Sequence, residues 1–242
     1  LDSPDSVSAA RFFLRLDDAP TCCIYCCRHG RVLVGNHHKW SHFLAWDPVT
    51  GDQHRIDFPP AVDGREKFLW KGALVCAAGD QGHLHGACHS SFRVVLLACS
   101  LEGIFAYVYS SVTGELGSLI STTMWPMEAR VEVDCVSTLV GNSVCCLLSL
   151  GTRCAILEFD LDSQNLDLIE VPLDAFGIDA SLRNDCQLWV TRAGGCGLGL
   201  LVLSGFSARL WKRKADCHGV AGWALTNTIE LDNFFRCDQG WT

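Results

Sequence analysis

One pattern recurs four times along this 242-residue chain: an apolar run, a short polar turn and a returning strand. The four copies span residues 43–59, 106–120, 155–172 and, more loosely, 208–231. Their turns are anchored at Asp47, Ser110, Asp160 and Lys212, which lie 63, 50 and 52 residues apart. A period of about 40–50 residues that contains only short strands is typical of propeller blades. The repeat therefore predicts a series of small antiparallel sheets.

The turns of the clearest copies have residues suited to hairpins. Asp47 and Ser110 have short polar side chains that can bond the backbone amides ahead of them. Thr-Gly closes both turns, and glycine tolerates the positive φ that such turns need. The tetrapeptide Leu-Val-Gly-Asn also occurs twice, at 33–36 and 139–142, 106 residues or two periods of 53 apart. We interpret this recurrence as a second mark of the repeat.

Helical patterns are almost absent, because apolar residues rarely recur at spacings of three and four over ten or more positions. Four hairpin copies fill the chain, whereas closed propellers usually have about 4–8 blades. We therefore expect an all-β, β-propeller-like fold with about four blade-type repeats, forming a single domain over residues 1–242 that is part of a larger ring. A closed four-bladed ring and an irregular β-sandwich with repeated hairpins are the alternatives.

Composition limits the possible partners. Hydrophobic residues make up 49% of the chain and charged residues 19%, so it can build a core. The formal charge of -8 argues against nucleic acid as a partner. Residues 1–5 do not resemble a signal peptide, and the uncharged stretch 135–152 is too polar for a membrane helix and predicts a pair of core strands. We expect a soluble protein without a membrane partner, in the cytoplasm or nucleus.

Fifteen cysteines are an odd and high number for such a chain. Many lie inside apolar runs, as Cys99, Cys145 and Cys146 do, where cysteine behaves as a small buried hydrophobe. No Asn-x-Ser/Thr sequon occurs, which disfavours secretion. These observations predict reduced intracellular thiols and no bound metal.

Five colinear phrases resemble the C-terminal, F-box-associated propeller-like region of the large grass and plant F-box protein family. They are FLAWDPVTGDQHRIDFPP, GHLHGACHSSFRVVLLAC, YVYSSVTGELGSLIS, TLVGNSVCCLLSLGTRCAILEFDLDSQNLDLIEVP and LSGFSARLWKRKADCHGVAGWALTNTIELD. The likeness runs from about Ala10 to Asp232 and so covers nearly the whole chain.

The resemblance implies a division of labour. In that family an N-terminal F-box of three short helices docks on the Skp1 adaptor of an SCF-type ubiquitin ligase, and the C-terminal region recognises the protein destined for ubiquitination. No F-box precedes Arg11 in this sequence. We therefore expect the recognition half only, with Skp1 binding confined to a full-length form, and further blades after Asp232.

A zinc site is the first chemical alternative. Cys23 and Cys26 have a spacing that suits zinc, and His85 with His89 could complete a tetrahedral set. Adjacent strand residues point to opposite faces, so the paired cysteines around these positions cannot all face one ion. We expect no metal and no cofactor.

Enzymatic motifs are weak. The glycine-rich run 194–199 is followed by a strand-like apolar run rather than by the helix that a phosphate-binding loop needs, so we predict a hairpin. Ser204 is not in a G-x-S-x-G elbow. Asp160 and Asp162 lie in a turn, where we expect them to cap backbone amides. We predict no catalytic residues.

The segment 209–214, Arg-Leu-Trp-Lys-Arg-Lys, is basic and contains an aromatic residue. It could bind an acidic peptide or a nucleic-acid strand. Lysine and arginine on an edge strand more often guard it against edge-to-edge pairing, and the acidity of the chain favours this interpretation.

The sequence thus predicts a non-catalytic protein-binding module that resembles the substrate-recognition region of an F-box subunit, with an unknown target protein. The alternatives are a metal-stabilised or ligand-binding β-domain with enzymatic activity and a nonfunctional truncated remnant.

Overall fold

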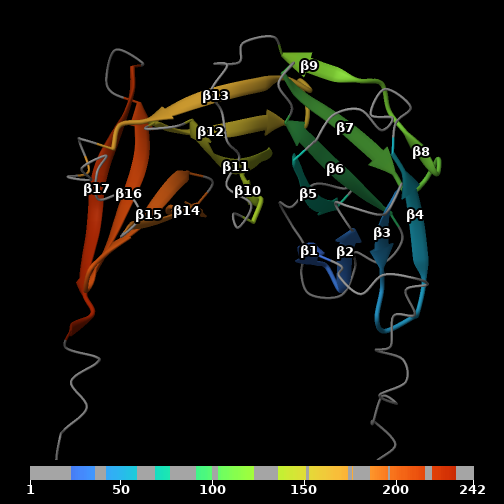
Figure 1. Ribbon diagram of the computed structural model, residues 1–242, viewed down its shortest axis with the longest axis horizontal. Coiled ribbons are helices and arrows are strands. Elements are labelled where there is room, and N and C mark those ends of the chain that lie inside the picture. Colours follow the sequence, from blue (N-terminus) through green and yellow to red (C-terminus); the bar gives the residue numbers. More distant parts are fainter. Residues whose placement is uncertain are drawn as a thin grey trace, which may run out of the picture. The chain divides into compact units, whose positions relative to one another are not determined.

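The computed structural model of the chain describes residues 23–35, 42–58, 69–76, 91–99, 103–122, 136–150, 153–173, 176, 186–195, 197–215 and 220–232. All the elements formed by these residues are strands, β1 to β17, joined into small antiparallel sheets (Figure 1). The chain divides into two compact units, Leu1–Met127 with Ser163–Leu166 and Glu128–Asp162 with Asp167–Thr242. Within the described residues we find no helix with the length and hydropathy needed to cross a bilayer.

The first sheet follows the chain strand by strand. It contains β1 (Cys23–Arg28), β2 (Arg31–Gly35), β3 (His42–Trp46) and β4 (Gln53–Asp57), in that order. Phe43 pairs with Gly35 on one side and with Ile56 on the other, so three strands present residues of one register to the same face.

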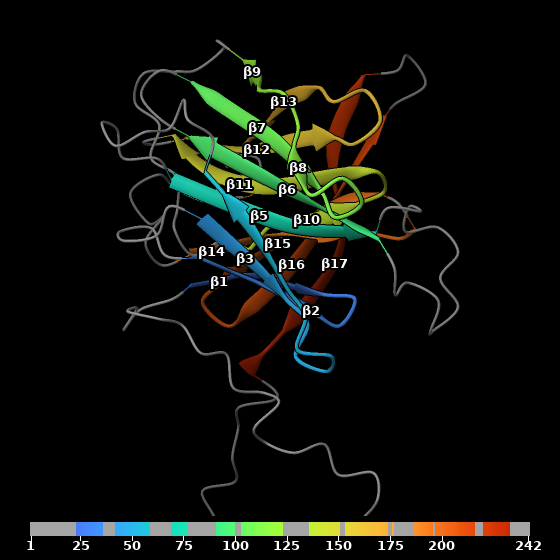
Figure 2. The ribbon, with the colours of Figure 1, turned by 90° about the vertical axis from the view of Figure 1, so that its right-hand side faces the viewer.

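The second sheet has three long strands and two very short ones. It contains β5 (Leu69–Cys76), β6 (Phe92–Cys99), β7 (Ile104–Ser110), β8 (Glu115–Leu116) and β9 (Ile120–Thr122). β5, β6 and β7 lie side by side in Figure 2, and both β8 and β9 pair with β7. β6 is buried along nearly its whole length, as expected of a strand covered on both faces.

Aromatic side chains fill the core of this first unit. Both sheets contribute to one cluster that contains Tyr25, Phe43, Trp70, Phe92, Tyr107 and Tyr109. The Phe43 ring lies 5.1 Å from Tyr25 and 5.5 Å from Trp70 between ring centroids, both in edge-on geometry. Such arrangements add to the hydrophobic gain because the positive edge of one ring meets the negative face of the next.

The second unit repeats the architecture with two further four-stranded sheets. The third sheet contains β10 (Thr138–Val140), β11 (Ser143–Leu150), β12 (Arg153–Asp160) and β13 (Leu166–Val171). The fourth contains β14 (Cys186–Arg192), β15 (Leu198–Ser204), β16 (Ser207–Ala215) and β17 (Ala221–Glu230).

The core of the second unit is mainly aliphatic. Leu147, Ile156, Leu200 and Val202 are buried in it, and two aromatic residues of this unit, Phe159 and Phe176, are also fully buried. The two sheets are also joined by hydrogen bonds from side chains to backbone. Thr138 Oγ1 donates to the Val190 carbonyl at 3.0 Å.

The predicted propeller-like, all-β fold is confirmed, since each predicted hairpin lies in its own small sheet. The stretch 135–152 contains β10 and β11, two partly or wholly buried strands, as expected. Whether residues 1–242 act as one domain remains a prediction.

Two details of the repeat predicted from the sequence were wrong. The first Leu-Val-Gly lies inside β2, the second strand of its sheet, whereas the second copy ends β10, a first strand, and continues into a turn. The shared tetrapeptide therefore does not mark equivalent positions. Lys212 is not a turn anchor either, because β16 continues to Ala215 and Lys212 pairs with Ala224 in mid-strand.

The expectation of reduced cysteines holds for most of the described positions but fails at one. Cys26, Cys99 and Cys145 are buried thiols without a disulfide. Burial raises the pKa of the Cys99 and Cys145 thiols to about 12. Cys76 at the end of β5, however, is disulfide-bonded. Its buried position shows that an apolar setting does not by itself keep a cysteine reduced.

Candidate interaction surface

The turn between β3 and β4 is held by its own side chains. Asp47 Oδ1 accepts hydrogen bonds from the amides of Val49 at 2.9 Å and Thr50 at 3.2 Å. The Gly51 amide donates to the Asp47 carbonyl at 2.8 Å, and the Asp52 amide donates to Thr50 Oγ1 at 3.2 Å. Gly51 has a φ of 83°, which favours glycine there.

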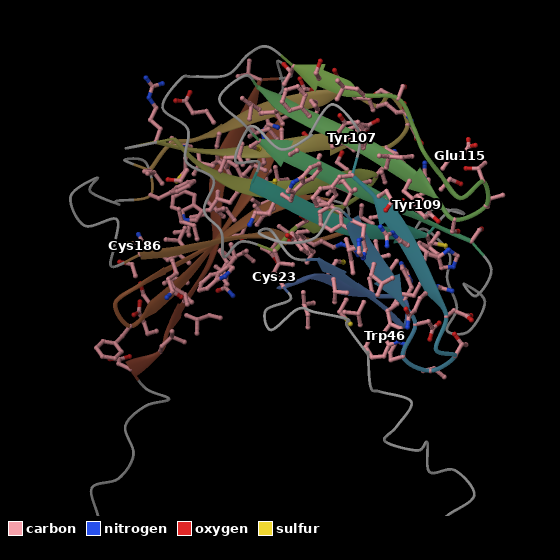
Figure 3. All side chains as sticks on the ribbon, turned by 45° about the vertical axis from the view of Figure 1, so that its right-hand side comes forward. Cys23, Trp46, Tyr107, Tyr109, Glu115 and Cys186 are labelled. Atoms are coloured by element: carbon pink, nitrogen blue, oxygen red, sulfur yellow. The ribbon has the colours of Figure 1, made fainter. Side chains whose placement is uncertain are left out.

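The turn between β7 and β8 repeats this construction residue by residue. Ser110 Oγ accepts from the Val112 amide at 3.3 Å, and the Gly114 amide donates to the Ser110 carbonyl at 2.9 Å. The Glu115 amide donates to Thr113 Oγ1 at 3.3 Å. Figure 3 labels Glu115, where this turn ends. The common pattern is Asp or Ser, any residue, Val, Thr, Gly and an acid.

The turn between β12 and β13 is a third copy with different residues. Asp160 Oδ1 accepts from the Asp162 amide at 3.1 Å, which confirms the capping role predicted for Asp160. Gln164 takes the place of the glycine and has a φ of 52°. Asp162 stands where the other two turns have valine. The backbone scaffold is therefore kept while the residue at the tip changes.

The valine tips of the first unit are exposed. Val49 is 54% exposed and Val112 is 73% exposed, so two apolar side chains project from turns whose backbones are held by hydrogen bonds. We name these two turns, residues 47–52 and 110–115, the valine turns. Apolar side chains on a fixed scaffold are suited to contact with a protein partner, because burying them there costs little ordering entropy.

A buried polar cluster supports the first of these turns. Arg31 and Asp47 are each only 8% exposed, and their side chains approach to 3.9 Å. The Arg31 guanidinium carbon lies 4.8 Å from the centroid of the Phe92 ring, which connects β2 to the start of β6 in the neighbouring sheet. A buried cation needs both a carboxylate and ring or hydrogen-bonding partners to offset its lost hydration.

His54 and Tyr109 extend this cluster. The His54 ring meets the Phe92 ring edge-on at 4.9 Å between centroids, and Tyr109 Oη lies 3.5 Å from His54 Nδ1. Figure 3 shows Tyr109 on the strand that leads into the second valine turn. The cluster therefore connects the strands that position both valine turns, and it fixes the two sheets against each other.

Of the four zinc ligands considered, only the two cysteines lie within the described residues. Cys26 is buried and its Sγ lies 3.5 Å from the Leu74 amide as an acceptor, whereas Cys23 is exposed. Desolvation by burial raises the pKa of the Cys26 thiol, which disfavours the thiolate that zinc requires. His85 and His89 lie outside the described residues. Among the residues that are described, no three His, Cys, Asp or Glu gather as a metal-binding group.

The glycine-rich run forms the predicted hairpin between β14 and β15. The Ala193 amide donates to the Gly197 carbonyl at 2.8 Å, and Lys212 Nζ donates to the Gly194 carbonyl at 3.3 Å. The strand β15 begins within this run, at Leu198, and ends at Ser204. A strand in this place provides no helix N-terminus for a phosphate.

The basic segment 209–214 is not an edge strand, contrary to our expectation. It belongs to β16, which pairs with β15 on one side and with β17 on the other. Trp211 packs on the Phe176 ring at 4.3 Å between centroids and so serves the core. The role of a guard against edge pairing is therefore wrong for these residues, because the edge belongs to β17.

The sequence interpretation treated 47–52 and 110–115 only as hairpin turns and missed their tips. The available signal was the identity of Val-Thr-Gly in both copies, which is more than a turn requires. Turn geometry demands the Asp or Ser and the glycine, whereas the valines take part in the turns through their backbone amides and not through their side chains.

Distant structural likenesses to solved proteins include the following two. KlHsv2 with loop 6CD replaced by a Gly-Ser linker is 12% identical, with a TM-score of 0.44 over 85% of this chain and 57% of that chain. Kluyveromyces lactis Hsv2 is also 12% identical, with a TM-score of 0.32 over 90% of this chain and 88% of that one. The chain thus spans little more than half of the first structure. No curated protein matches the sequence.

A family model gives the decisive match. The β-propeller of F-box protein AT5G49610-like proteins aligns with residues 23–239, which includes every strand from β1 to β17. The match agrees with the four small sheets, the repeated turns and the resemblance seen in the sequence. The chain belongs to the F-box protein AT5G49610-like β-propeller family.

Proposed function

We propose that this chain is a non-catalytic protein-binding module, the part of an F-box subunit that holds the target of an SCF-type ubiquitin ligase. Family membership supports a protein-interaction role. The valine turns are the observation that carries the proposal, because they combine a scaffold fixed by hydrogen bonds with exposed apolar tips.

In this role the propeller contacts the target, and an F-box connects the module to the Skp1 adaptor. The ligase-docking function belongs to the full-length form, which acts in the cytoplasm or nucleus. The charge of -8 suits a target with basic residues near its apolar contact, since Asp52 and Glu115 directly follow the valine turns' glycines.

The experiment compares retained proteins across variants. The chain is expressed with an affinity tag in plant cells, and proteins cross-linked to it are identified by mass spectrometry. A target must then bind the purified chain directly. We expect Val49→Asp with Val112→Asp to weaken that binding at least about tenfold, since hot-spot side chains commonly contribute about 2 kcal/mol or more.

A matched control uses an exposed apolar residue elsewhere. Phe206, between β15 and β16 in the second unit, is 67% exposed. Phe206→Asp therefore also replaces an exposed apolar side chain by a carboxylate, as the valine substitutions do. We expect it to leave binding unchanged. Equal binding by the double valine variant and by the original chain would contradict the assignment of the surface. Turnover of any bound small molecule would contradict the non-catalytic role.

A further inference from the structure

The outer edges of the four sheets differ in how they are protected. The first sheet ends in β4, five residues long, where Arg55 Nε and Asp57 Oδ1 form an exposed ion pair at 2.7 Å. The second ends in β8 and β9, of two and three residues. Charged side chains and short length are the usual devices that prevent a sheet edge from pairing with another chain.

The third sheet is protected in the same way. β13 has six residues, carries Asp167 and Glu170, and is followed at once by Pro172. Arg153 of the neighbouring β12 lies 3.7 Å from the Glu170 carboxylate. A proline at the end of an edge strand removes a backbone donor and stops further pairing.

The outer strand of the fourth sheet is neither short nor charged along its length, and it contains no proline. This strand, β17, has ten residues, and Glu230 at its end is the charged residue among them. It contains Leu225 and Ile229, which are 48% and 45% exposed. Three of its residues are β-branched, namely Thr226, Thr228 and Ile229. Within the described residues β16 is its one partner strand. A register shift between Leu210 and Trp211 leaves Thr226 of β17 outside the pairing, and on either side of it alternate amides and carbonyls of β17 point away from the sheet.

Charge at the two ends of this edge is opposite. Arg213 and Lys214 of β16 pair with Trp223 and Gly222, at the beginning of β17. Glu230 ends the strand and Asp232 follows it. If two copies of β17 pair antiparallel, the basic end of each sheet lies beside the acidic end of the other, so the edge is complementary to itself.

We propose that β17 is a self-association edge, where a second copy of this chain adds its own β17 antiparallel to form one continuous eight-stranded sheet across a two-fold axis. Backbone hydrogen bonds supply the attraction, Leu225 and Ile229 are partly covered, and the charges set the antiparallel direction. The three protected edges of the same molecule take no part.

The test measures the mass of the purified chain in solution by analytical ultracentrifugation at about 1 to 100 μM, a range that detects micromolar association. We expect a reversible dimer. Leu225→Lys with Asn227→Lys places like charges across the pair and should weaken the dimer at least about tenfold, which corresponds to roughly 1.4 kcal/mol. The matched control Gln53→Lys, on the protected edge β4, should have no effect.

A charge exchange tests the direction of pairing. Glu230→Lys alone should weaken the dimer, and adding Lys214→Glu should restore it, because complementarity is re-established with the signs reversed. Circular dichroism and thermal unfolding of each variant establish that the fold is kept. A wild-type chain that stays monomeric to the highest concentration overturns the proposal, as does a dimer unaffected by the two lysines. A monomer whose β17 binds an extended target peptide also overturns it and assigns the edge to the target instead.

Discussion

The two units of this protein are built from the same kind of sheet but filled with different side chains. In the first unit six buried aromatic residues of two sheets gather in one cluster, and Phe43 contacts two of the other rings, Tyr25 and Trp70. In the second unit aliphatic residues such as Leu147 and Ile156 fill the equivalent space. The blade repeat therefore specifies backbone pairing and turn chemistry, whereas the residues that fill the core can vary.

The two cores offer substitutions of very different size, and their costs should differ accordingly. Phe43→Ala should lower the free energy of unfolding by about 3–5 kcal/mol, because it removes ring contacts and leaves a large cavity. Ile156→Val in the second unit should cost only about 0.5–1.5 kcal/mol. Urea unfolding followed by tryptophan fluorescence measures both. A cost below about 2 kcal/mol for Phe43→Ala would mean that the aromatic cluster repacks freely.

A close approach in the first unit gives the next largest effect. A Cβ at Gly72 of β5 would collide with the Leu33 side chain of β2, which is fully buried. Gly72→Ala should therefore cost about 1–3 kcal/mol through overpacking. Gly222 in the second unit has open space around it, so Gly222→Ala should be neutral or stabilise by up to about 1 kcal/mol. An equal loss of unfolding free energy in both variants would show that the strand propensity of the residue, and not the contact with Leu33, determines the cost.

The anchors of the two valine turns, both in the first unit, should differ in how much they stabilise the fold. Asp47→Ala removes two accepted hydrogen bonds and the carboxylate beside buried Arg31, and should cost about 1–3 kcal/mol. Ser110→Ala removes one longer bond and should cost about 0.5–1.5 kcal/mol. Asp47→Asn keeps an acceptor oxygen and should lie between the original chain and Asp47→Ala. Chemical denaturation of the three variants checks the order.

The smallest effect near neutral pH concerns one buried thiol in each unit. The pKa values of Cys99 and Cys145 are about 12 in the folded chain, raised by burial from 9.0. The unfolded chain therefore loses these protons first, so their contribution to stability is present below pH 9 and is lost between pH 9 and about 12. Unfolding free energies at about pH 8 and above about pH 10 should show this decline, and Cys99→Ala with Cys145→Ala should reduce it.

Structure could be predicted from the sequence best where it is determined by the chemistry of a few neighbouring residues. Asp47, Ser110 and Asp160 anchor turns because a short polar side chain and a positive-φ residue suffice to reverse the chain, whatever surrounds them. Lys212 lacks such a side chain, and there the strand continues to Ala215. The hairpins were thus predictable from a few residues each.

Features that depend on neighbours in space were beyond the sequence. The segment 209–214 resembles an edge because lysine and arginine often guard edges, but only the sheet order shows β17 outside β16. The cluster of Arg31, Asp47 and Phe92 joins residues up to 61 positions apart, and no local pattern connects them. The disulfide at Cys76 was missed because burial and oxidation leave the same apolar signature around a cysteine.

The valine turns have a consequence for how such a protein evolves. Val49 and Val112, like Asp162 at the tip of the third turn, contribute to the hydrogen bonds of their turns only through their backbone amides, which every residue but proline possesses. Substitution at these tips therefore escapes purifying selection for stability and is exposed only to selection for what the tip touches. A gene family that duplicates this scaffold can acquire new specificities by single codon changes, without first compensating for a damaged fold.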